Sequence, residues 1–424
     1  MPMSQSPLAS DSAVIVKGSG LSHHINVLRH LVVPAREVEG VLTELKSKDW
    51  VGQGFLVLPS SIEGHKLVPV DGSAPVDLPA PLGSFEVEIR EGEPDKRALA
   101  DWLSHLETLI GKQEVLEKGE AWPSSHEFIS DMMIVRIDEE ISNYTLEIAE
   151  AKLRSHPHVR LILNDEGVQG ELRVRGLAPI GAREGGEIYL GEVPAKLCNT
   201  RVSVKESGIS ITCDPTKAFY STKLQTERIE TVTLAKRLRE RLGRPIRVCD
   251  PFCGVGPAIG ALLKEPELIG SFVASDLNPH AVEMLMENLR RWDNRDYPPS
   301  SVSLQRLFDG RFAGVADATE LRESPDLLGN WDLILVNLPH RTIELLPELI
   351  PLLDLNTPSL IRGRVVVAED EIDESNQEIV RVLPTLLEGE EPPSLQVKRD
   401  YSSSLRLCSF EAWIGSDNGA PTGI

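Results

Sequence analysis

The stretch Ile246-Arg-Val-Cys-Asp-Pro-Phe-Cys-Gly-Val-Gly-Pro257 decides the fold of this 424-residue chain. Its first four residues are mostly apolar and β-branched, as in a short buried strand. The glycine-rich turn that follows leads into the apolar segment 258–263, which is typical of a helix. Glycines in such a turn let the backbone bend tightly and approach a ligand closely. The stretch therefore indicates a strand, a ligand-binding turn and a helix, in that order.

The residues that follow repeat this alternation of strand and helix. Further strands are expected at 272–275, 333–336, 365–368 and 407–414. Between the first two of these, residues 279–289 carry apolar side chains at helical spacing after an Asn-Pro start. Alternating strands and helices predict an α/β fold with a doubly wound, mostly parallel sheet.

The first half of the chain has shorter apolar runs between turn-rich stretches, as in small α+β modules. Residues 1–20 are rich in Ser and Gly, and we expect them to fray. The other elements expected there are helices at 96–118 and 145–155 and strands at 133–137, 159–163 and 170–177. We predict three domains: an accessory α+β domain at 1–118, a middle α+β domain at 119–210 and a Rossmann-type domain at 211–424.

The glycine-rich turn also predicts a site for a nucleotide-like cofactor. Asp250 ends the strand, Phe252, Gly254 and Gly256 lie in the turn, and Asp276 ends the next strand, where a carboxylate can accept both hydroxyls of a ribose. A dinucleotide and a purely structural loop are the alternatives. Pro257 occupies part of the turn that would close on a pyrophosphate, whereas S-adenosylmethionine has no phosphate to hold. The pattern therefore favours this methyl donor.

Two further loops are expected at the same edge of the sheet. Asp317 precedes the strand at 333–336 and is placed to reach an adenine amino group, although an Asp before a helix also serves as an N-cap. Asn337-Leu-Pro-His340 follows that strand. Enzymes that methylate exocyclic amines carry a second Pro and an aromatic residue in this loop, so the sequence argues against amino-group methylation. His340 is a candidate general base or an incidental loop residue.

Charge is unevenly distributed along the chain. The net charge of −21 argues against a nucleic-acid partner, because phosphate binding depends on Lys and Arg. However, residues 217–247 hold nine Lys and Arg against three Glu, whereas residues 369–391 hold nine acids against one Arg. Binding follows the local field, so one face is able to bind a polyanion. A solvated helix face explains the basic run equally well.

Several classes of protein are not indicated. No apolar run approaches the ~18 residues that span a bilayer, and residues 1–12 lack the pattern of a signal peptide. The five cysteines form no Cys-x-x-Cys pair, so neither disulfides nor a zinc site is predicted. We expect a cytoplasmic, monomeric protein with no metal and no membrane partner.

The ordered motifs resemble the Rossmann-type tRNA guanine-37 N1-methyltransferase family of archaea and eukaryotes, whose nearest relatives are the aminocarboxypropyl transferases of the wybutosine pathway. The motifs that carry the resemblance are Arg173-Val-Arg175, Phe219-Tyr-Ser-Thr-Lys-Leu-Gln-Thr-Glu-Arg228, residues 250–257, Asp276-Leu-Asn-Pro279 and Asn337-Leu-Pro339. The resemblance implies a class I methyltransferase fold, S-adenosylmethionine as cofactor and tRNA as partner. The tRNA would be bound through its anticodon stem-loop and its body, and the N-terminal residues would form the accessory domain.

The resemblance also implies roles for individual residues. Arg175 would contact the guanine carbonyl oxygen, Glu227 would act as general base, and Asn337 would position the base. The remaining substrate-binding residues would be Phe219, Tyr220, Ser221, Lys223 and Arg228. The cofactor-binding residues would be Asp250, Phe252, Gly254, Gly256, Asp276, Leu277, Asp317, Asn337 and Pro339. The family often has Tyr where this chain has Phe219, so a contact from that hydroxyl is in doubt.

The residue types alone leave other readings open. Glu227 also fits a salt-bridged surface helix, Arg175 an exposed strand, and Phe219 and Tyr220 a core. The chemistry nevertheless suits guanine N1, which becomes a good nucleophile once a carboxylate removes its proton and a cation stabilises O6. The alternatives are aminocarboxypropyl transfer from the same cofactor to a modified guanine, and a non-catalytic tRNA-binding protein. The Asn337-Leu-Pro339 motif and the intact acids favour methyl transfer.

Overall fold

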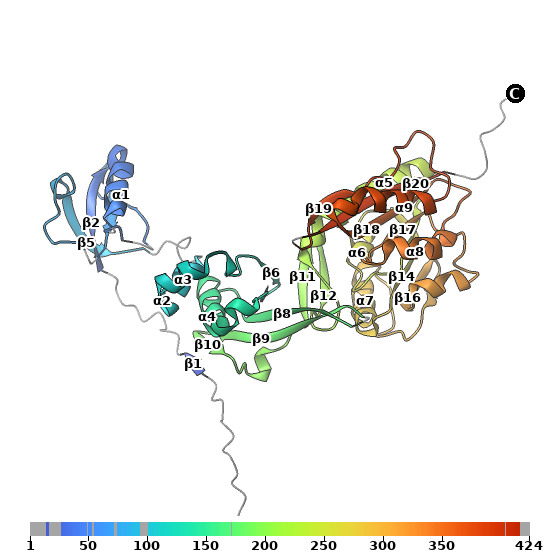
Figure 1. Ribbon diagram of the computed structural model, residues 1–424, viewed down its shortest axis with the longest axis horizontal. Coiled ribbons are helices and arrows are strands. Elements are labelled where there is room, and N and C mark those ends of the chain that lie inside the picture. Colours follow the sequence, from blue (N-terminus) through green and yellow to red (C-terminus); the bar gives the residue numbers. More distant parts are fainter. Residues whose placement is uncertain are drawn as a thin grey trace, which may run out of the picture. The chain divides into compact units, whose positions relative to one another are not determined.

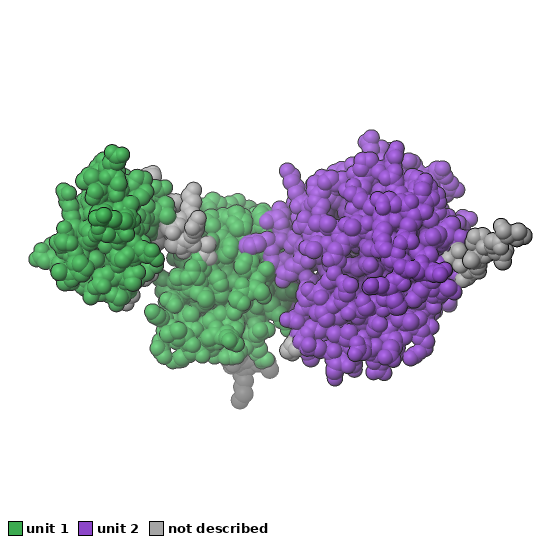
Figure 2. Space-filling model, turned by 90° about the horizontal axis from the view of Figure 1, so that it is seen from above, with its two compact units in different colours: residues 1–126, 131–165, 178–199 green, residues 127–130, 166–177, 200–424 purple. Residues whose placement is uncertain are grey.

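The computed structural model describes residues 14–16, 27–48, 50–52, 55–71, 74–93, 101–170, 172–402 and 404–415. By the density of contacts between residues, the chain divides into two compact units, which Figure 2 distinguishes by colour. Unit 1 comprises residues 1–126, 131–165 and 178–199, and unit 2 comprises residues 127–130, 166–177 and 200–424. The expected fraying of residues 1–20 lies outside the described residues, apart from 14–16.

An eight-stranded sheet forms the centre of unit 2 (Figure 1). Its strand order is β15-β16-β14-β13-β17-β18-β20-β19. The five strands from β16 to β18 are parallel, and β15, β20 and β19 are antiparallel to their neighbours. The strands are β13 (Ile246–Asp250), β14 (Ile269–Asp276), β15 (Gln305–Phe308), β16 (Arg311–Val315), β17 (Leu333–Val336), β18 (Ser359–Ala368), β19 (Gln396–Asp400) and β20 (Leu405–Ile414). Because β13 lies between β14 and β17, a ligand crevice is expected beyond its carboxyl end.

Helices cover both faces of this sheet. Along β13, Val248 packs with α5, α6 and α7, whereas the next residue, Cys249, packs with α8 and α9 on the opposite face. This alternation follows from the pleat, which turns successive side chains to opposite faces. The helices are α5 (Gln225–Leu242), α6 (Pro257–Leu263), α7 (Pro279–Trp292), α8 (Thr342–Leu349) and α9 (Ile372–Val382). The predicted doubly wound α/β fold is therefore confirmed.

Local chemistry determines where two of these helices begin. Asn278 caps α7 by accepting a hydrogen bond from the His280 N–H at 2.9 Å, and Pro279 is the first helical residue, as predicted. Pro257 has the same place in α6. The preceding Gly256 has φ +87°, and a Cβ there would lie 2.5 Å from the Leu285 side chain. Only glycine fits this position without a shift of the core.

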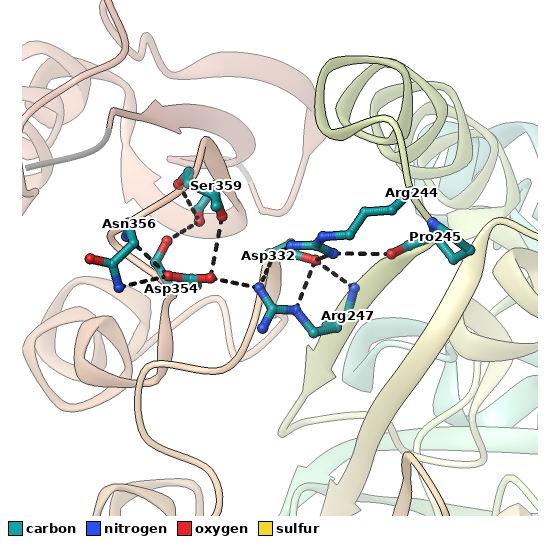
Figure 3. Close-up of polar contacts among 8 residues, drawn as sticks. Arg244, Pro245, Arg247, Asp332, Asp354, Asn356 and Ser359 are labelled. Carbon is teal, nitrogen blue, oxygen red and sulfur yellow. Dashed lines mark hydrogen bonds and ion pairs between the residues drawn. The ribbon is translucent and has the colours of Figure 1, made fainter. Parts of the chain in front are cut away.

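A charged network joins the amino ends of the central strands (Figure 3). Asp332, which is fully buried, accepts hydrogen bonds from the guanidinium groups of Arg244 and Arg247 at 2.6–3.2 Å. Arg247 also bonds Asp354 at 2.7 Å, and Ser359 donates to the Asp354 carbonyl at 2.8 Å. The network thus ties together the starts of β13, β17 and β18, at the edge opposite the glycine-rich turn.

Unit 2 also contains a two-stranded antiparallel sheet of β11 (Val202–Glu206) and β12 (Ile209–Cys213). The Trp292 indole at the end of α7 donates to the Ser210 carbonyl at 3.0 Å, which attaches β12 to the helix layer. The short 3-10 helices of unit 2 are η7 (Thr222–Leu224), η8 (Ala318–Glu323), η9 (Ile350–Leu352) and η10 (Glu369–Glu371).

The N-terminal module is an antiparallel sheet with its own core. Its strand order is β3-β4-β2-β5, and α1 packs on it through Val41 and Leu45 against Leu31 and Val33. The elements are β2 (Val27–Pro34), η1 (Ala35–Glu37), α1 (Val38–Ser47), β3 (Leu58–Pro59), β4 (His65–Val70), η2 (Leu82–Ser84) and β5 (Glu86–Glu91).

A six-stranded mixed sheet follows, with the order β1-β10-β9-β8-β7-β6. Its strands are β1 (Val14–Val16), β6 (His126–Ile129), β7 (Met132–Val135), β8 (Leu161–Gln169), β9 (Val174–Glu184) and β10 (Glu187–Leu190). Its helices are α2 (Trp102–Ile110), α3 (Lys112–Lys118), η4 (Gly119–Ala121), η5 (Glu139–Tyr144), α4 (Thr145–Ser155) and η6 (Ala195–Leu197). The turn between β8 and β9, with the strand ends beside it, is part of unit 2.

The differences from the expected elements have local causes. The helix expected at 96–118 is two helices, α2 and α3, because Gly111 between them has φ +92°. Strands β15, β16 and β19 were not expected. Trp102 and Leu106 of α2 and Val115 of α3 share a core with Ile148 of α4. The described residues therefore group α2 and α3 with the second module, although a boundary was predicted at 118.

Candidate functional site

A pocket of about 240 Å³ opens beyond the carboxyl ends of β13, β14, β16 and β17. All of its lining residues belong to unit 2. Of the predicted site residues, those that line the pocket are Phe219, Tyr220, Ser221, Arg228, Phe252, Gly254, Asp276, Leu277, Asp317, Asn337 and Pro339. Glu227, Arg175, Lys223, Asp250 and Gly256 do not line it. The sheet thus brings most of the predicted residues to one crevice.

The turn after β13 and the end of β14 form one side of the pocket. Gly254 has φ +56°, and its N–H donates to Asp276 Oδ2 at 2.8 Å. Asp276 Oδ1 accepts from the Asn278 N–H at 2.9 Å. Burial raises the pKa of Asp276, and these two backbone hydrogen bonds act against that effect. The carboxylate is therefore held in place by the backbone at the mouth of the crevice.

Leu277 and Asp317 continue this side of the pocket. Leu277 is 38% exposed and offers an apolar surface. Asp317 is the N-cap of η8, because its Oδ1 accepts from the Thr319 N–H at 2.9 Å and from the Thr319 hydroxyl at 2.8 Å. Among the described residues, no donor contacts Asp317 Oδ2. Asp317 is thus the helix cap that the sequence allowed, and it also lines the pocket. Its contact to an adenine amino group stays a prediction.

Asp250 lies one layer deeper, in the wall of a smaller cavity of about 40 Å³ beside the first. It is 3% exposed, and its Oδ1 has no hydrogen-bond partner among the described residues. Burial, supported by the nearby charge of Asp276, raises the pKa of Asp250 to about 7. Phe252 and Asn337 line both cavities. A buried carboxyl group with an unpaired oxygen therefore adjoins the pocket.

Glu227 reaches the pocket only through an arginine. It lies in the first turn of α5, is 6% exposed, and its Oε2 accepts from Arg364 Nε at 2.6 Å. Arg364 Nη1 donates to Asn337 Oδ1 at 2.8 Å. Arg364 and Asn337 both line the pocket. The surface ion pair that the sequence allowed for Glu227 is therefore a buried one, and it links the carboxylate to Asn337.

Arg175 is held by a carboxylate that the sequence gave no reason to select. Glu127, which is 5% exposed, accepts from Arg175 Nη1 at 2.9 Å, from the Ser221 hydroxyl at 2.6 Å and from the Thr222 N–H at 3.0 Å. The Arg175 guanidinium also lies 5.3 Å from the centre of the Phe219 ring, a cation–π distance. Phe219 is 40% exposed and lines the pocket, so this ring contacts the guanidinium and still has exposed surface.

Tyr220 and Arg228 form a second buried group. Arg228 donates to both oxygens of Glu206 at 2.6 Å and to the Ser221 carbonyl at 3.1 Å, and Tyr220 donates its hydroxyl to Glu206 at 3.0 Å. Burial raises the pKa of Tyr220. The core interpretation of Tyr220 therefore describes its side chain better than substrate contact does. Lys223 is exposed on η7 and donates its backbone N–H to Ser221 Oγ.

The mouth of the pocket holds His340 and three residues to which the sequence assigned no role. Arg173, Arg399 and Tyr401 line it, and neither the Arg173 side chain nor the Arg399 side chain forms a hydrogen bond or ion pair with another described residue. His340 Nε2 lies 3.0 Å from the Tyr401 hydroxyl, so this histidine has an orienting partner. Burial and the charge of Arg173 lower the pKa of His340, which favours the neutral ring. No motif marks Arg399 or Tyr401, because both come from an unexpected strand end.

Arg364 was not among the residues predicted for the site, although its position in the sequence carries a signal. It lies with Arg362 inside the otherwise apolar strand 360–367, where arginines at alternate positions face the same side. Two buried charges in a central strand require partners from elsewhere. Arginines inside an apolar strand therefore indicate a functional or structural charge pair.

Metal and membrane sites are not evident in what the structure describes. No three side chains of the metal-binding types gather among the residues described. None of the helices described combines the length and apolar character that crossing a bilayer requires.

The chain is similar to several known proteins. Residues 106–181 match the TYW2 N-terminal domain family. The tRNA (guanine(37)-N(1))-methyltransferase Trm5b of Pyrococcus abyssi is 31% identical over 169 residues, which are 40% of this chain and 44% of that protein. Seven further curated proteins that match carry the same activity in their names, so the chain has homologues named tRNA (guanine(37)-N(1))-methyltransferase.

Solved structures extend the likeness to nearly the whole fold. The crystal structure of Pyrococcus abyssi Trm5b covers 92% of this chain and 99% of its own, with a TM-score of 0.58 and 21% identity. The structure of aTrm5 in complex with tRNALeu covers 91% of this chain and 99% of its own, with a TM-score of 0.59 and 18% identity. At these identities the structures show a shared fold. The curated sequence match spans less than half of the first relative.

Proposed function

We propose that this chain transfers the methyl group of S-adenosylmethionine to N1 of guanine at position 37 of tRNA. The observation that carries the proposal is the chain of contacts from Glu227 through Arg364 to Asn337. Arg364 and Asn337 line the same pocket as Gly254 and Asp276. An amide for a base edge and a site for a nucleoside cofactor thus share one cavity, and a carboxylate for a proton lies behind the arginine that lines it. The homologues' names support the same reaction.

The residues at the carboxyl edge of the sheet fit this cofactor. Asp276 is placed by two backbone N–H groups to accept the hydroxyls of a ribose, and Leu277 offers an apolar surface for adenine. Asp317 Oδ2 is available for an adenine amino group. The unpaired Oδ1 of Asp250 suits the cationic end of the molecule. The bound cofactor supplies a methyl group activated by a sulfonium, which passes to the N1 lone pair while the sulfur keeps the bonding electrons.

Glu227 and Phe219 account for the other half of the reaction. Guanine N1 carries a proton and becomes nucleophilic only as that proton leaves, so a carboxylate within hydrogen-bond reach is required. Glu227 is that proton acceptor in our proposal, and Asn337 orients the base edge. Phe219 offers an exposed ring on which the guanine stacks, supported by Arg175. The N1 proton goes to a Glu227 oxygen.

We also propose a partner, a cellular compartment and an oligomeric state for the enzyme. The partner is tRNA, and the cationic mouth of the pocket, with Arg173 and Arg399, suits its backbone. All five cysteines are free thiols, which accords with a reducing compartment, and we place the enzyme in the cytoplasm. We also propose that the enzyme acts as a monomer.

A second candidate reaction has one observation in its favour. Residues 106–181 match the TYW2 N-terminal domain family. TYW2 belongs to the wybutosine pathway, whose transferases move an aminocarboxypropyl group. Incubation with tRNA and S-adenosylmethionine, followed by digestion and mass spectrometry of the nucleosides, separates the two. We expect guanosine heavier by one methyl group. A nucleoside heavier by an aminocarboxypropyl group would replace our proposal with the second candidate.

A further inference from the structure

Glu127 is a buried carboxylate that contacts the wall of the pocket and has no part in the reaction as proposed so far. It lies on β6, is 5% exposed and belongs to unit 2, as do its partners. Its Oε1 accepts from the Ser221 hydroxyl at 2.6 Å and from the Thr222 N–H at 3.0 Å. Its Oε2 accepts from Arg175 Nη1 at 2.9 Å. Both oxygens thus have donors, and one arginine compensates the charge.

The contacts of Glu127 lead to the Phe219 ring by two routes. The first runs through the backbone, because Ser221 is two residues after Phe219 and lines the same pocket. The second runs through Arg175, whose guanidinium lies over the ring, 5.3 Å from its centre. Glu127 therefore holds both the segment that carries the ring and the cation that contacts it.

The Phe219 ring needs such support, because packing alone does not fix it. The side chain is 40% exposed and so keeps part of its rotamer freedom. A cation over the ring favours one orientation, provided that the cation itself stays in place. Arg175 does stay in place, since leaving Glu127 would strand a carboxylate whose side chain is 4% exposed, which is costly.

A second buried carboxylate, Glu206, holds the same segment without reaching this ring. Its hydrogen bonds go to the Tyr220 hydroxyl and to the Arg228 guanidinium. Arg228 in turn lies over the Tyr220 ring, at 5.7 Å, and both of these side chains are buried. Of the two carboxylates, Glu127 is the one whose partner cation contacts Phe219.

We propose that Glu127 is a positioning residue for methyl transfer, which fixes the Phe219 ring as the platform for the target guanine. The inference rests on the proposed function and adds the residue that orders this platform before the base arrives. Glu127 does not line the pocket, so it acts through the ring and not on the base or the cofactor. A base that enters with N1 displaced by about 1 Å from the line of attack can lose about 10²-fold in rate.

A double-mutant cycle tests whether Glu127 acts through the ring. Wild type, Glu127→Gln, Phe219→Leu and the double variant are compared in single-turnover methyl transfer at saturating tRNA and cofactor. Glutamine keeps the size of the side chain and removes the charge that holds Arg175. Asp293→Asn is the matched control, because Asp293 is also a carboxylate of unit 2 that pairs with a buried arginine, Arg311 at 3.0 Å, and it does not line the pocket.

We expect Glu127→Gln to lower the rate by about 10–10²-fold through misplacement of the base. Phe219→Leu should lower it by about as much, because the base loses its stacking partner. In the double variant the change at Glu127 should cost less than about threefold more, since no ring is left to position. Asp293→Asn should lower the melting temperature and keep the wild-type rate. Cofactor affinity within a few-fold of wild type, by calorimetry, identifies the variants that fold.

Losses that multiply in the double variant would show that Glu127 does not act through the ring, and would overturn the inference while leaving the methylation intact. A wild-type rate for Glu127→Gln would do the same. If Glu127→Gln does not bind cofactor, Ser221→Ala takes its place in the cycle under the same criteria, because it removes the contact at 2.6 Å and leaves the ion pair. No methylguanosine with wild type would overturn the proposed function and the inference with it.

Discussion

Glu227 is a carboxylate enclosed by protein, and its reactivity depends on the single guanidinium that contacts it. Such a pair is stabilising only while both charges are present, since each has lost its hydration. In the proposed reaction the pair changes during the cycle, because the carboxylate gains a proton while the base becomes negative. The cation then has a new anionic partner beside it, so the buried site holds one positive and one negative charge before and after proton transfer.

Replacing Glu227 with Gln tests the proton acceptor at this scale. Glutamine keeps the shape and the hydrogen bond to Arg364 but cannot take a proton, so single-turnover methyl transfer should fall by about 10²–10⁴-fold. Affinities for tRNA and cofactor should stay within a few-fold. Glu230→Gln, one turn further along α5 and paired with Lys398 and Arg362, is the control and should keep its rate. A wild-type rate for Glu227→Gln would show that another group accepts the proton.

The pKa of Asp250 predicts a dependence of stability on pH. Burial raises this pKa to about 7, whereas in the unfolded chain it is about 3.9. Between these values the folded protein keeps a proton that the unfolded chain has released, so stability falls as pH rises through this window. Asp250→Asn removes the charge and should stabilise the cofactor-free protein near pH 8 by more than about 1.4 kcal/mol, the equivalent of one pKa unit.

Thermal unfolding at two pH values measures this effect. The difference in melting temperature between Asp250→Asn and wild type should be positive near pH 8 and should shrink as the pH falls towards about 4. At that pH the folded carboxyl is protonated and the unfolded one is about half protonated. A difference that grows towards low pH would show that Asp250 is stabilised by charge, contrary to its buried and unpaired setting.

At the scale of elements, charged residues inside the central sheet are stabilised by partners that are distant in the sequence. Arg311 at the start of β16 is 8% exposed and pairs with Asp293 at 3.0 Å. This explains why β16 was not expected, because a strand that opens with a charge reads as a loop unless its partner is known. The same holds for Arg364 in β18. By contrast, β13, β14 and β17 were expected because their apolar character and turn residues are local.

The residues of the candidate site also fall into two groups, those that the local sequence predicts and those that depend on distant partners. The glycine-rich turn, Asp276 and Asn337 follow strand ends, so the sheet alone brings them to one edge and the sequence sufficed to predict their proximity. Glu127 and Arg364 act through ion pairs with residues 48 and 137 positions away. Only a folded chain reveals such pairings, and no spacing rule finds them.

The network at the amino ends of the strands should contribute stability and no chemistry (Figure 3). Burial alone would raise the pKa of Asp332, but hydrogen bonds from Arg244 and Arg247 lower it below its usual range. Asp332→Ala should destabilise unit 2 by about 3 kcal/mol, at the low end for a broken buried ion pair because the arginines keep some solvent access. The deficit should begin to shrink as the pH falls below about 4, the usual pKa of an Asp, and should disappear only as the pH falls through the lowered pKa of folded Asp332.

Calorimetry with and without cofactor checks this prediction. Because the network lies at the edge of the sheet opposite the pocket, the affinity of the folded variant for cofactor should match wild type at 20 °C or below. Asp309→Ala, in the exposed turn between β15 and β16, is a control that should leave the melting temperature unchanged. A large loss of cofactor affinity with unchanged stability would contradict the structural role.

At the scale of the whole molecule, the N-terminal module can be removed at a natural boundary. Its core around Leu31, Val33 and Leu45 is separate from the cluster of Trp102 and Leu106. Deleting residues 27–93 therefore spares α2 and α3 as well as β1, which belongs to the six-stranded sheet of the second module, whereas a cut at 118 would open the second cluster. We expect tRNA affinity to fall by about tenfold, or about 1.4 kcal/mol, with cofactor affinity unchanged. Unchanged tRNA affinity would show that the module has a role other than tRNA binding.

The central claim is that this chain methylates N1 of guanine 37, and the position of the mark tests it most directly. The full chain is incubated with S-adenosylmethionine and either of two unmodified tRNA transcripts, identical except for guanine or adenine at position 37. Digestion and mass spectrometry then identify the methylated nucleoside and its place in the sequence. The account predicts 1-methylguanosine at position 37 of the first transcript and no methylation of the second. Methylation of the adenine transcript, or of another position in both, would contradict it.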